Sequence, residues 1–205
     1  MWTRDALSGV FVDDVTGLVL PEEQIEQYSW DLIQGSTTFL QGLLDAAIPG
    51  SIEYTGFENT VREELRSLYI NQYLLGIGGL DQMTTSDWGS IGGMLHEQYV
   101  WLSAFVDELR TGSISEEEFR RRLNMYANSS REAFERAKQR AAQKMGFNEE
   151  RWIVSTKYEN CDECLALAEM GWVSIGKLPF PGQGRTACLT NCHCTKEYRR
   201  SRSGE

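Results

Sequence analysis

The sequence predicts a mainly α-helical protein, in which a helical body containing a long antiparallel helix pair precedes a small C-terminal cysteine-rich α+β knob. Apolar residues recur at three- and four-residue spacing through most of the chain, and capping residues and glycines mark the ends of these segments. All five cysteines lie between 161 and 194. With 205 residues, 41% of them hydrophobic, the chain can build one sizeable core and a small appendage. The expected divisions are an N-terminal arm with short helices (1–55), a helical body (56–148) and a cysteine-rich zinc-binding module with a basic tail (149–205).

The N-terminal region mixes strand-like and helical patterns. Residues 8–20 predict either a short hairpin around Asp13-Asp14 or an extended arm that packs on a partner. Pro21 is followed by acidic residues that complement a helix dipole, which predicts a helix through about Gln34. A further helical element is expected at 39–47, and the Pro49-Gly50 pair that follows is expected to end it.

Two helices are expected in the first part of the body. Asn59 is a candidate N-cap for an apolar-periodic segment that the glycine cluster at 76–79 stops. That cluster lacks the Gly-Lys-Ser/Thr ending of a phosphate loop, so we do not expect nucleotide binding. The residues at 84–87 offer caps for a long helix that ends before Gly112.

A second long helix follows at once. Ser115 and Glu118 have the spacing of a capping box, and apolar periodicity then continues until Gly146. A bend is expected near 128–130, where an Asn-Ser-Ser run interrupts the pattern. Because the link between the two long helices is short and contains glycine, they are expected to form an antiparallel hairpin.

The charge distribution limits the possible partners. The net charge of −10 argues against a general nucleic-acid binder, which needs clustered Lys and Arg to contact phosphates. The segment 120–144 and the tail are nevertheless basic. Such a stretch is usually a solvated helix face, and the alternative is a face for an acidic protein or for DNA. The residues expected on that face are Arg120, Arg121, Arg131, Lys138, Arg199 and Arg200.

The cysteines have metal-ligand spacing. A C-x2-C turn at 161–164 lets two thiolates meet one ion, and a second close group at 188–194 can complete a tetrahedron across a loop of roughly 23 residues. Zinc would supply stability that so small a module cannot draw from its own core. Adjacent residues point in different directions, so a four-coordinate site cannot easily take all of 192–194. The candidate ligands are Cys161, Cys164 and Cys188, with one or both of Cys192 and Cys194, and His193 as a further candidate.

Three other interpretations of the cysteines remain open at this level. They could be plain thiols in a reducing cytoplasm, or they could form disulfides in oxidising surroundings, which would leave one of the five unpaired. A redox-active C-x2-C is disfavoured because no thioredoxin-like βαβ pattern surrounds Cys161.

The sequence does not predict an enzyme, and no catalytic residue is assigned. Of the two histidines, His96 lies in an apolar-periodic helix and nothing pairs it with a cysteine nucleophile. The His-x-Glu and Pro-Cys-x2-Cys pattern of zinc deaminases is missing. No small-molecule substrate is expected. No membrane association is expected either, because the sequence lacks the apolar run of roughly 20 residues that spans a bilayer and the layout of a secretory signal.

Two stretches of the chain, together spanning roughly residues 75–198, carry a family resemblance. The body stretch comprises 78–89, 98–102, Phe105, 112–115 and 122–127. The C-terminal stretch comprises Trp152, 161–164, 171–173, 178–179, Gly184 and 191–194. In these residues the chain resembles bacteriophage head-morphogenesis proteins, the minor capsid proteins of the phage Mu F-like type.

The C-terminal match is the more specific of the two. Members of that family pair a C-x2-C with a later C-x-C that is often preceded by His and Pro. Here Cys188 stands near the place of that His, and His193 replaces an Arg between the last two cysteines. These departures leave the fourth metal ligand open.

The resemblance implies a virion structural protein that acts in phage or prophage head assembly. Such a protein would be assembled in the bacterial host cytoplasm and reside in the phage head. Its expected partners are the portal and/or the major capsid protein, with packaged DNA as a further candidate. The alternative function is a cytoplasmic zinc-binding regulatory protein that contacts nucleic acid through the basic helix and tail.

Overall fold

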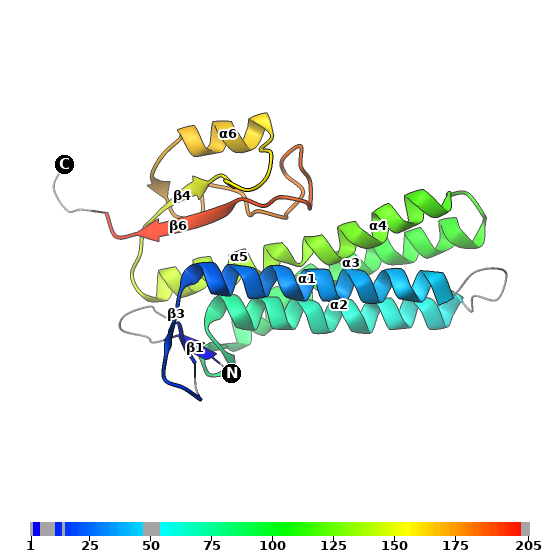
Figure 1. Ribbon diagram of the computed structural model, residues 1–205, viewed down its shortest axis with the longest axis horizontal. Coiled ribbons are helices and arrows are strands. Elements are labelled where there is room, and N and C mark those ends of the chain that lie inside the picture. The colour runs from blue at the N-terminus through cyan, green and yellow to red at the C-terminus, as the bar shows by residue number, and fades with distance from the viewer. Residues whose placement is uncertain (1, 5–10, 14, 47–53, 202–205) are drawn as a thin grey trace.

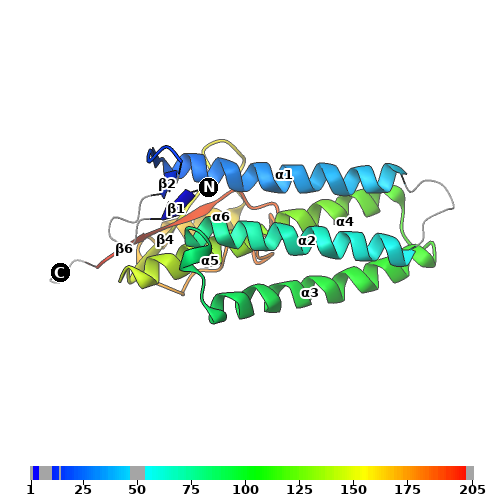
Figure 2. The same ribbon diagram turned by 90° about the horizontal axis from the view of Figure 1, so that it is seen from below.

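The computed structural model describes residues 2–4, 11–13, 15–46 and 54–201, and it confirms the predicted mainly helical fold class. Four helical rods lie side by side as a bundle (Figures 1 and 2). The rods are α1 (Glu22–Ala46), α2 (Tyr54–Ile77), α3 (Thr85–Arg110) and a last rod made of α4 (Glu116–Ser129) and α5 (Arg131–Lys144). The cysteine-rich region sits as a separate layer on one side of the bundle, above α5 in Figure 1.

A small sheet lies at one end of the bundle. It pairs β1 (Trp2–Arg4), β2 (Phe11–Asp13) and β3 (Val19–Leu20) in antiparallel order. The β2–β3 turn forms because Asp13 Oδ1 accepts hydrogen bonds from the backbone N–H groups of Val15 (3.0 Å) and Thr16 (2.8 Å). The predicted hairpin is therefore confirmed, although Asp14 lies outside the described residues.

Helix α1 differs from the prediction, because it is one continuous helix of 25 residues and not two short elements. The buried side chains of Ile33, Leu40 and Leu44 form a stripe that crosses the expected break. Within that break the Thr38 hydroxyl donates to the carbonyl of Gln34 at 2.9 Å, which fits an unbroken helix. The Pro49-Gly50 pair that was expected to end this region lies outside the described residues.

Helix α2 begins before the predicted cap, so Asn59 lies inside the helix and is not its N-cap. The helix ends as predicted at the glycine cluster, where Gly78 and Gly79 have φ of 95° and 105°. A Cβ at Gly76 would lie 2.4 Å from the carbonyl oxygen of Phe134. This close backbone approach explains the glycine and makes α5 the tightest neighbour of α2.

Both predicted caps of the long helices form, one completely and one in part. At the start of α3, Asp87 accepts from the backbone N–H of Thr84 (2.8 Å) while Thr84 accepts from that of Asp87 (3.4 Å), which is a full capping box. At the start of α4, the hydroxyl of Ser115 accepts from the Glu118 N–H at 3.2 Å. The Glu118 carboxylate instead binds Arg121 and Arg122 at 2.8 Å, so that capping box is only half formed.

The predicted bend is confirmed, because α4 ends and α5 begins around Ser130. The hydroxyls of Ser129 and Ser130 each donate at 2.7 Å to carbonyls one turn earlier, a pattern that bends helices. Helix α3 runs antiparallel to the bent rod, as expected for the predicted pair (Figure 2). Helix α3 contacts both halves of that rod: the rings of Phe105 and Phe119 lie 5.0 Å apart, and Arg140 of α5 lies 3.7 Å from Asp87 of α3.

The C-terminal module is a small α+β unit. Its sheet has the order β5 (Val173–Ser174), β4 (Glu149–Ile153), β6 (Thr195–Arg199), with both pairs antiparallel, and α6 (Asp162–Glu169) lies beside it. Strand β6 occupies part of the segment predicted as a basic tail. Among the described residues, no helix combines the length and the hydrophobicity needed to cross a bilayer.

Candidate metal centre

Three segments bring the cysteines of the module together. Cys161 is the N-cap of α6, and Cys164 lies in its first turn, where the N–H of Leu165 donates to the Cys161 carbonyl at 3.1 Å. Cys188 and Cys192 lie in the loop that leads to β6, and Cys194 directly precedes that strand. The short helix therefore supplies one half of the cluster and the end of the loop supplies the other.

The sulfur–sulfur distances have the size expected around one metal ion. Cys161–Cys188, Cys164–Cys188 and Cys164–Cys192 each have Sγ atoms 3.7 Å apart. Zinc–thiolate bonds of about 2.3 Å in a tetrahedron place the sulfurs about 3.8 Å apart. A disulfide would require about 2.05 Å, and all five thiols are free. The cluster is thus compatible with a metal site, and no pair in it is a disulfide.

The five sulfurs form two overlapping groups. Cys161, Cys164 and Cys188 lie within 4.8 Å of one another, and so do Cys164, Cys192 and Cys194. Cys164 belongs to both groups and is the centre of the cluster. Three cysteines preferred from the sequence thus lie together, and Cys192 and Cys194 both remain candidates for the fourth position.

His193 lies apart from both groups. Its ring is stacked between Trp30 of α1, with centroids 4.1 Å apart, and Tyr158, at 3.8 Å. Alternate residues of an extended segment point to opposite sides, so the two flanking cysteines face the cluster while His193 faces the bundle. The candidate ligand His193 is therefore corrected to a contact between the module and α1.

The turn after Cys188 is built around an unusual backbone conformation. Leu189 has φ of +51°, the one positive value among the described non-glycine residues. Its N–H donates to the Thr186 carbonyl at 2.8 Å, and the Asn191 N–H donates to the Cys188 carbonyl at 3.0 Å. The Thr186 hydroxyl lies 3.1 Å from Cys188 Sγ and can donate to a thiolate there. These contacts fix Cys188 relative to Cys192.

The thiol pKa values in the cluster are shifted in opposite directions. Burial raises the pKa of the Cys164 thiol, whereas a hydrogen bond from Cys192 lowers the pKa of Cys194. The pKa of Cys161 is lowered by the backbone N–H groups of Cys164 and Cys188, which outweigh its burial. Metals bind the thiolate form, so the site already favours ionisation at two of its sulfurs.

The module has little apolar core beyond the cysteines. Its buried cluster consists of Trp152 and Leu178 together with Cys164, Cys192 and Cys194. A buried ion pair replaces further apolar packing: Lys196 Nζ lies 2.9 Å from Glu150 Oε2, and both side chains are fully buried. Glu150 also accepts from the backbone N–H of Leu178 at 2.8 Å, which ties the pair to the loop after β5.

Two residues expected on the basic face are buried under the module. Arg131 is 0% exposed and lies 2.7 Å from Glu135, and Lys138 is 5% exposed and lies 2.7 Å from Glu26. Arg131 also pairs with Glu26. Despite its own burial, Glu26 has a pKa of about 2 because Arg131 and Lys138 stabilise its charge. The assignment of Arg131 and Lys138 to a partner-facing surface is therefore wrong, because the module covers that face of α5.

The module is attached to the bundle through this buried network. The hydroxyl of Thr195, at the start of β6, lies 3.0 Å from Glu26 Oε1 and 2.9 Å from Glu135 Oε1 and donates its single proton to one of these carboxylates. A Cβ at Gly182 would lie 2.8 Å from Cβ of Arg131, so the loop needs glycine to approach α5. The i,i+4 spacing of Arg131 and Glu135 was a local signal for an ion pair, but nothing local indicated Glu26 or Thr195.

The other predicted basic residues are at least partly exposed, but each has a partner. Arg120 binds Asp45 at 2.6 Å, Arg121 binds Glu118 and Arg199 binds Glu149 at 2.7 Å. Arg200 donates to the Met145 carbonyl at 2.7 Å. These pairs neutralise much of the charge that the sequence placed on a basic face.

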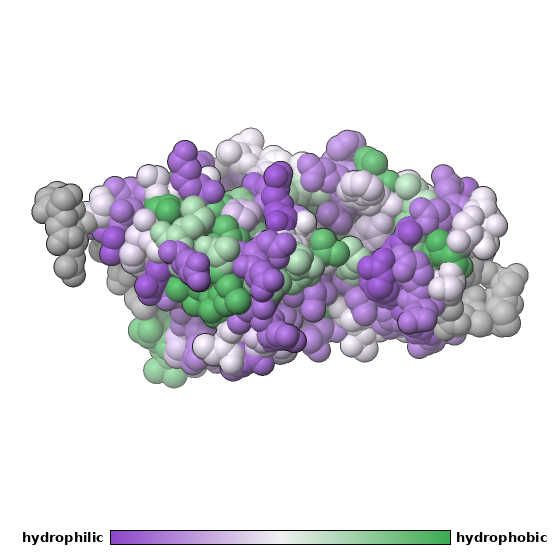
Figure 3. All heavy atoms as spheres, turned by 90° about the horizontal axis from the view of Figure 1, so that it is seen from above, coloured by the Kyte–Doolittle hydropathy of each residue, from purple (hydrophilic) through white to green (hydrophobic). Residues whose placement is uncertain are grey.

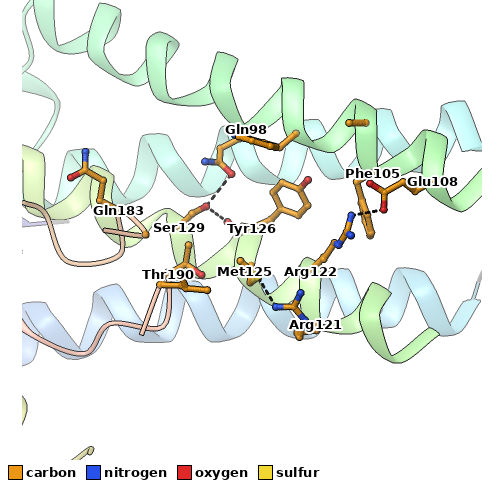
Figure 4. A pocket seen from close by; sticks show the side chains of 14 residues that line it. Gln98, Phe105, Glu108, Arg121, Arg122, Met125, Tyr126, Ser129, Gln183 and Thr190 are labelled. Carbon is orange, nitrogen blue, oxygen red and sulfur yellow. Dashed lines mark hydrogen bonds and ion pairs between the residues drawn. The ribbon is translucent and has the colours of Figure 1, made fainter. Parts of the chain in front are cut away.

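A groove of about 590 Å³ lies between α3, α4 and the loop at 183–190 (Figure 4). Polar contacts cross it, since Arg122 binds Glu108 at 2.7 Å and the Ser129 hydroxyl lies 3.3 Å from Gln98 Oε1. The polar side chains drawn there are thus largely engaged with one another.

Comparisons with protein-family models, with curated proteins and with solved structures find no match for this chain. The fold and the site define its class: a four-rod helical bundle that carries a cysteine-cluster module.

Proposed function

We propose that this chain is a structural protein of a phage head, which acts by binding other subunits and whose C-terminal module is clamped by one zinc ion. The observation that carries the zinc part is the set of 3.7 Å sulfur–sulfur distances among Cys161, Cys164, Cys188 and Cys192. Zinc fits this site better than hard cations because its donors are thiolates with no nearby carboxylate in the groups.

The zinc clamp is tested by metal analysis and thiol titration of the purified chain. We expect roughly one zinc per chain and thiols that become reactive only after chelation. Cys164→Ser should lose the metal, because Cys164 belongs to both sulfur groups. A metal-free protein with five reactive thiols, or with four blocked ones, would refute the clamp.

The capsid role is supported by the sequence resemblance and by the outer surface of the module. Leu165, Met170 and Leu189 are exposed by 44%, 53% and 45%. Figure 3 shows hydrophobic atoms gathered among hydrophilic ones on the side of the molecule that carries the module. Exposed apolar surface of this kind is typical of proteins that bind other subunits. The portal or the major capsid protein is the proposed partner.

Packaged DNA and regulatory nucleic acid receive less support from the structure. Arg131 and Lys138 are buried, and the exposed arginines at 120, 121 and 199 are paired with acids. A DNA-binding face needs charges that are free to replace counterions on phosphates. Binding by the purified chain that weakened steeply with salt would favour the nucleic-acid alternative.

The capsid role is tested by tagging the chain in cells that produce the phage or the induced prophage. We expect portal or capsid subunits to co-purify with it, and the chain to be present in assembled heads. A double variant of the exposed apolar surface, Met170→Asp with Leu165→Asp, should keep zinc but reduce this association. Heads that assemble normally without the chain, and that never contain it, would refute the proposal.

A further inference from the structure

The groove beside the loop at 183–190 runs along two helices (Figure 4). Each helix lines it with residues at three- and four-residue spacing, and such residues lie on one side of a helix. They include Gln98, Trp101 and Phe105 on α3, and Arg122, Met125 and Ser129 on α4. The groove therefore presents one side of α3 and one side of α4 to solvent.

The centre of the groove is apolar. The contact of Gln98 with Ser129 lies toward one end and the Glu108–Arg122 pair toward the other. Between these two polar contacts lie the side chains of Trp101, Phe105, Met125 and Tyr126. Trp101 is 67% exposed, so its ring offers uncovered apolar surface. From 98 to 108 helix α3 rises by about 15 Å, which is the length of about three helical turns.

The groove continues past Gln98 and Trp101 into a second hollow of about 470 Å³, lined by α3, α5 and the same loop. Its two walls carry opposite charges. Glu97 of α3 and Arg185 of the loop are exposed, and within the described residues neither has a hydrogen bond or an ion pair. Burial raises the pKa of Glu132 in the same hollow, and Glu97 raises it further. A partner that brings a cation to the α3 wall and an anion to the loop would neutralise both walls.

We propose that this groove binds a short amphipathic helix of another protein. The apolar stripe of that helix covers Trp101, and its flanks carry a basic residue opposite Glu97 and an acidic residue opposite Arg185. Helices that bind in grooves present apolar residues at i, i+4 and i+7, which span about 10 Å and fit the apolar centre. Only the naming of that protein as a portal or capsid subunit rests on the proposed function. Leu189 supports this naming, because it lines the groove and belongs to the exposed apolar surface of the module.

A helix of another protein fits the groove better than other occupants do. The described walls are helices and a loop, so an extended peptide would find no sheet edge there to pair with. A second copy of this chain fits poorly, because no described helix exposes large apolar side chains at three positions of i, i+4, i+7 spacing. Nucleic acid is disfavoured because Arg121, Arg122 and Arg136 are paired with acids.

The first test replaces Trp101 by the photoreactive amino acid benzoylphenylalanine in the full chain, in cells that produce the phage or the induced prophage. We expect a cross-link to one segment of a portal or capsid subunit, with apolar residues at i, i+4 and i+7. The same replacement of Trp88 is the matched control. Trp88 is also an exposed tryptophan of α3, but it lines neither hollow and lies on another side of the helix. It should not cross-link to that segment.

The second test measures the binding of a synthetic peptide of the cross-linked segment to the purified, zinc-loaded chain. The peptide should gain helical circular dichroism when it binds. Trp101→Glu should weaken binding at least about tenfold, whereas Trp88→Glu should leave it unchanged. Thermal unfolding of both variants checks that they fold. Glu97→Lys should also weaken binding, and an acidic residue in place of the basic one that faces it in the peptide should restore it.

Several outcomes would overturn the groove assignment. They are the absence of a cross-link from position 101, equal cross-links from position 88, a link to a second copy or to a segment that binds without helix, and equal peptide binding by Trp101→Glu and Trp88→Glu. Head subunits that co-purify in full with Trp101→Glu would also overturn it, and the proposed function would stand. A cross-linked helix that binds in the groove but belongs to a protein outside the head would refute the proposed function and leave the groove assignment intact.

Discussion

The helical bundle and the cysteine module are stabilised in different ways. The bundle buries many apolar side chains along four rods, including Leu65, Phe105 and Phe119. The hydrophobic cluster of the module consists of Trp152, Leu178 and three cysteines, and one buried ion pair lies beside it. The stability of the bundle is therefore distributed over many contacts, whereas that of the module depends on a few chemical groups. The two regions should respond very differently to the loss of one group.

The largest expected effect comes from metal removal. Chelation, or Cys164→Ser, should unfold the module and leave the bundle helical, because structural zinc in small domains supplies on the order of 10 kcal/mol. Near-ultraviolet circular dichroism and proteolysis between 150 and 200 should change strongly. The far-ultraviolet helix signal should change little, since the long helices lie before the module.

Leu65→Ala should destabilise the bundle and leave the metal site intact. Leu65 is fully buried in the bundle, so its truncation should cost about 2–5 kcal/mol of bundle stability. Zinc content should remain unchanged. If chelation and Leu65→Ala melted the same cooperative unit, the two regions would not be separable and the comparison would fail.

The next largest effect on stability is expected at the buried Glu150–Lys196 ion pair of the module. Glu150→Gln leaves Lys196 buried without its counter-charge, which should cost about 3–5 kcal/mol in urea unfolding of the zinc-loaded protein. Glu197→Gln is the matched control, because the Arg151–Glu197 pair at 2.6 Å lies on the same sheet but is largely exposed. That change should cost less than about 1 kcal/mol. Equal losses would show that burial does not set the importance of these pairs.

The bundle was largely predictable because its pattern is local. Apolar periodicity and caps located α3, and the Asn-Ser-Ser run located the bend before α5. The continuity of α1 was missed, because a glycine and several hydroxyl residues hide a buried stripe that only tertiary packing reveals. Arg131 and Lys138 were misassigned for the same reason: burial under the module is a long-range property that spacing does not report.

In the module, cysteine spacing was sufficient to predict which segments meet. Spacing does not give the direction of each side chain, so it does not distinguish His193, whose ring is stacked between Trp30 and Tyr158, from a metal ligand. The strand β6 was missed because its Lys-, Glu- and Arg-rich sequence resembles a solvated tail. Its charges are tolerated because Lys196 and Arg199 have acidic partners on β4.

The contact between the two regions should depend on pH through Glu26. Its folded-state pKa of about 2 lies below the usual 4.5, so its stabilising effect is present above about pH 4.5 and is lost as pH falls toward 2. The shift corresponds to about 3 kcal/mol. The difference in unfolding free energy between wild type and Glu26→Gln should therefore be large at neutral pH and shrink across this window.

Comparing the two proteins at each pH removes effects that they share, such as loss of metal in acid. Glu63→Gln is the control, because Glu63 lies in an exposed pair with Arg66 at 3.6 Å and should show no such dependence. A difference between wild type and Glu26→Gln that stayed constant down to pH 2 would contradict the role given to Glu26.

The smallest expected effect concerns the turn that holds Cys188. Leu189 has φ of +51° and its side chain is 45% exposed, so Leu189→Gly removes backbone strain and loses little packing. We expect the module to keep its zinc affinity and to gain up to about 1 kcal/mol, after the greater freedom of glycine in the unfolded chain is included. Leu165→Gly makes the same truncation at an equally exposed position in α6, where it should cost about 1 kcal/mol because glycine disfavours helix. Chelator competition and thermal unfolding measure both changes. A loss of zinc affinity in Leu189→Gly would contradict this expectation. It would show that the leucine side chain, and not the backbone of the turn, positions Cys188.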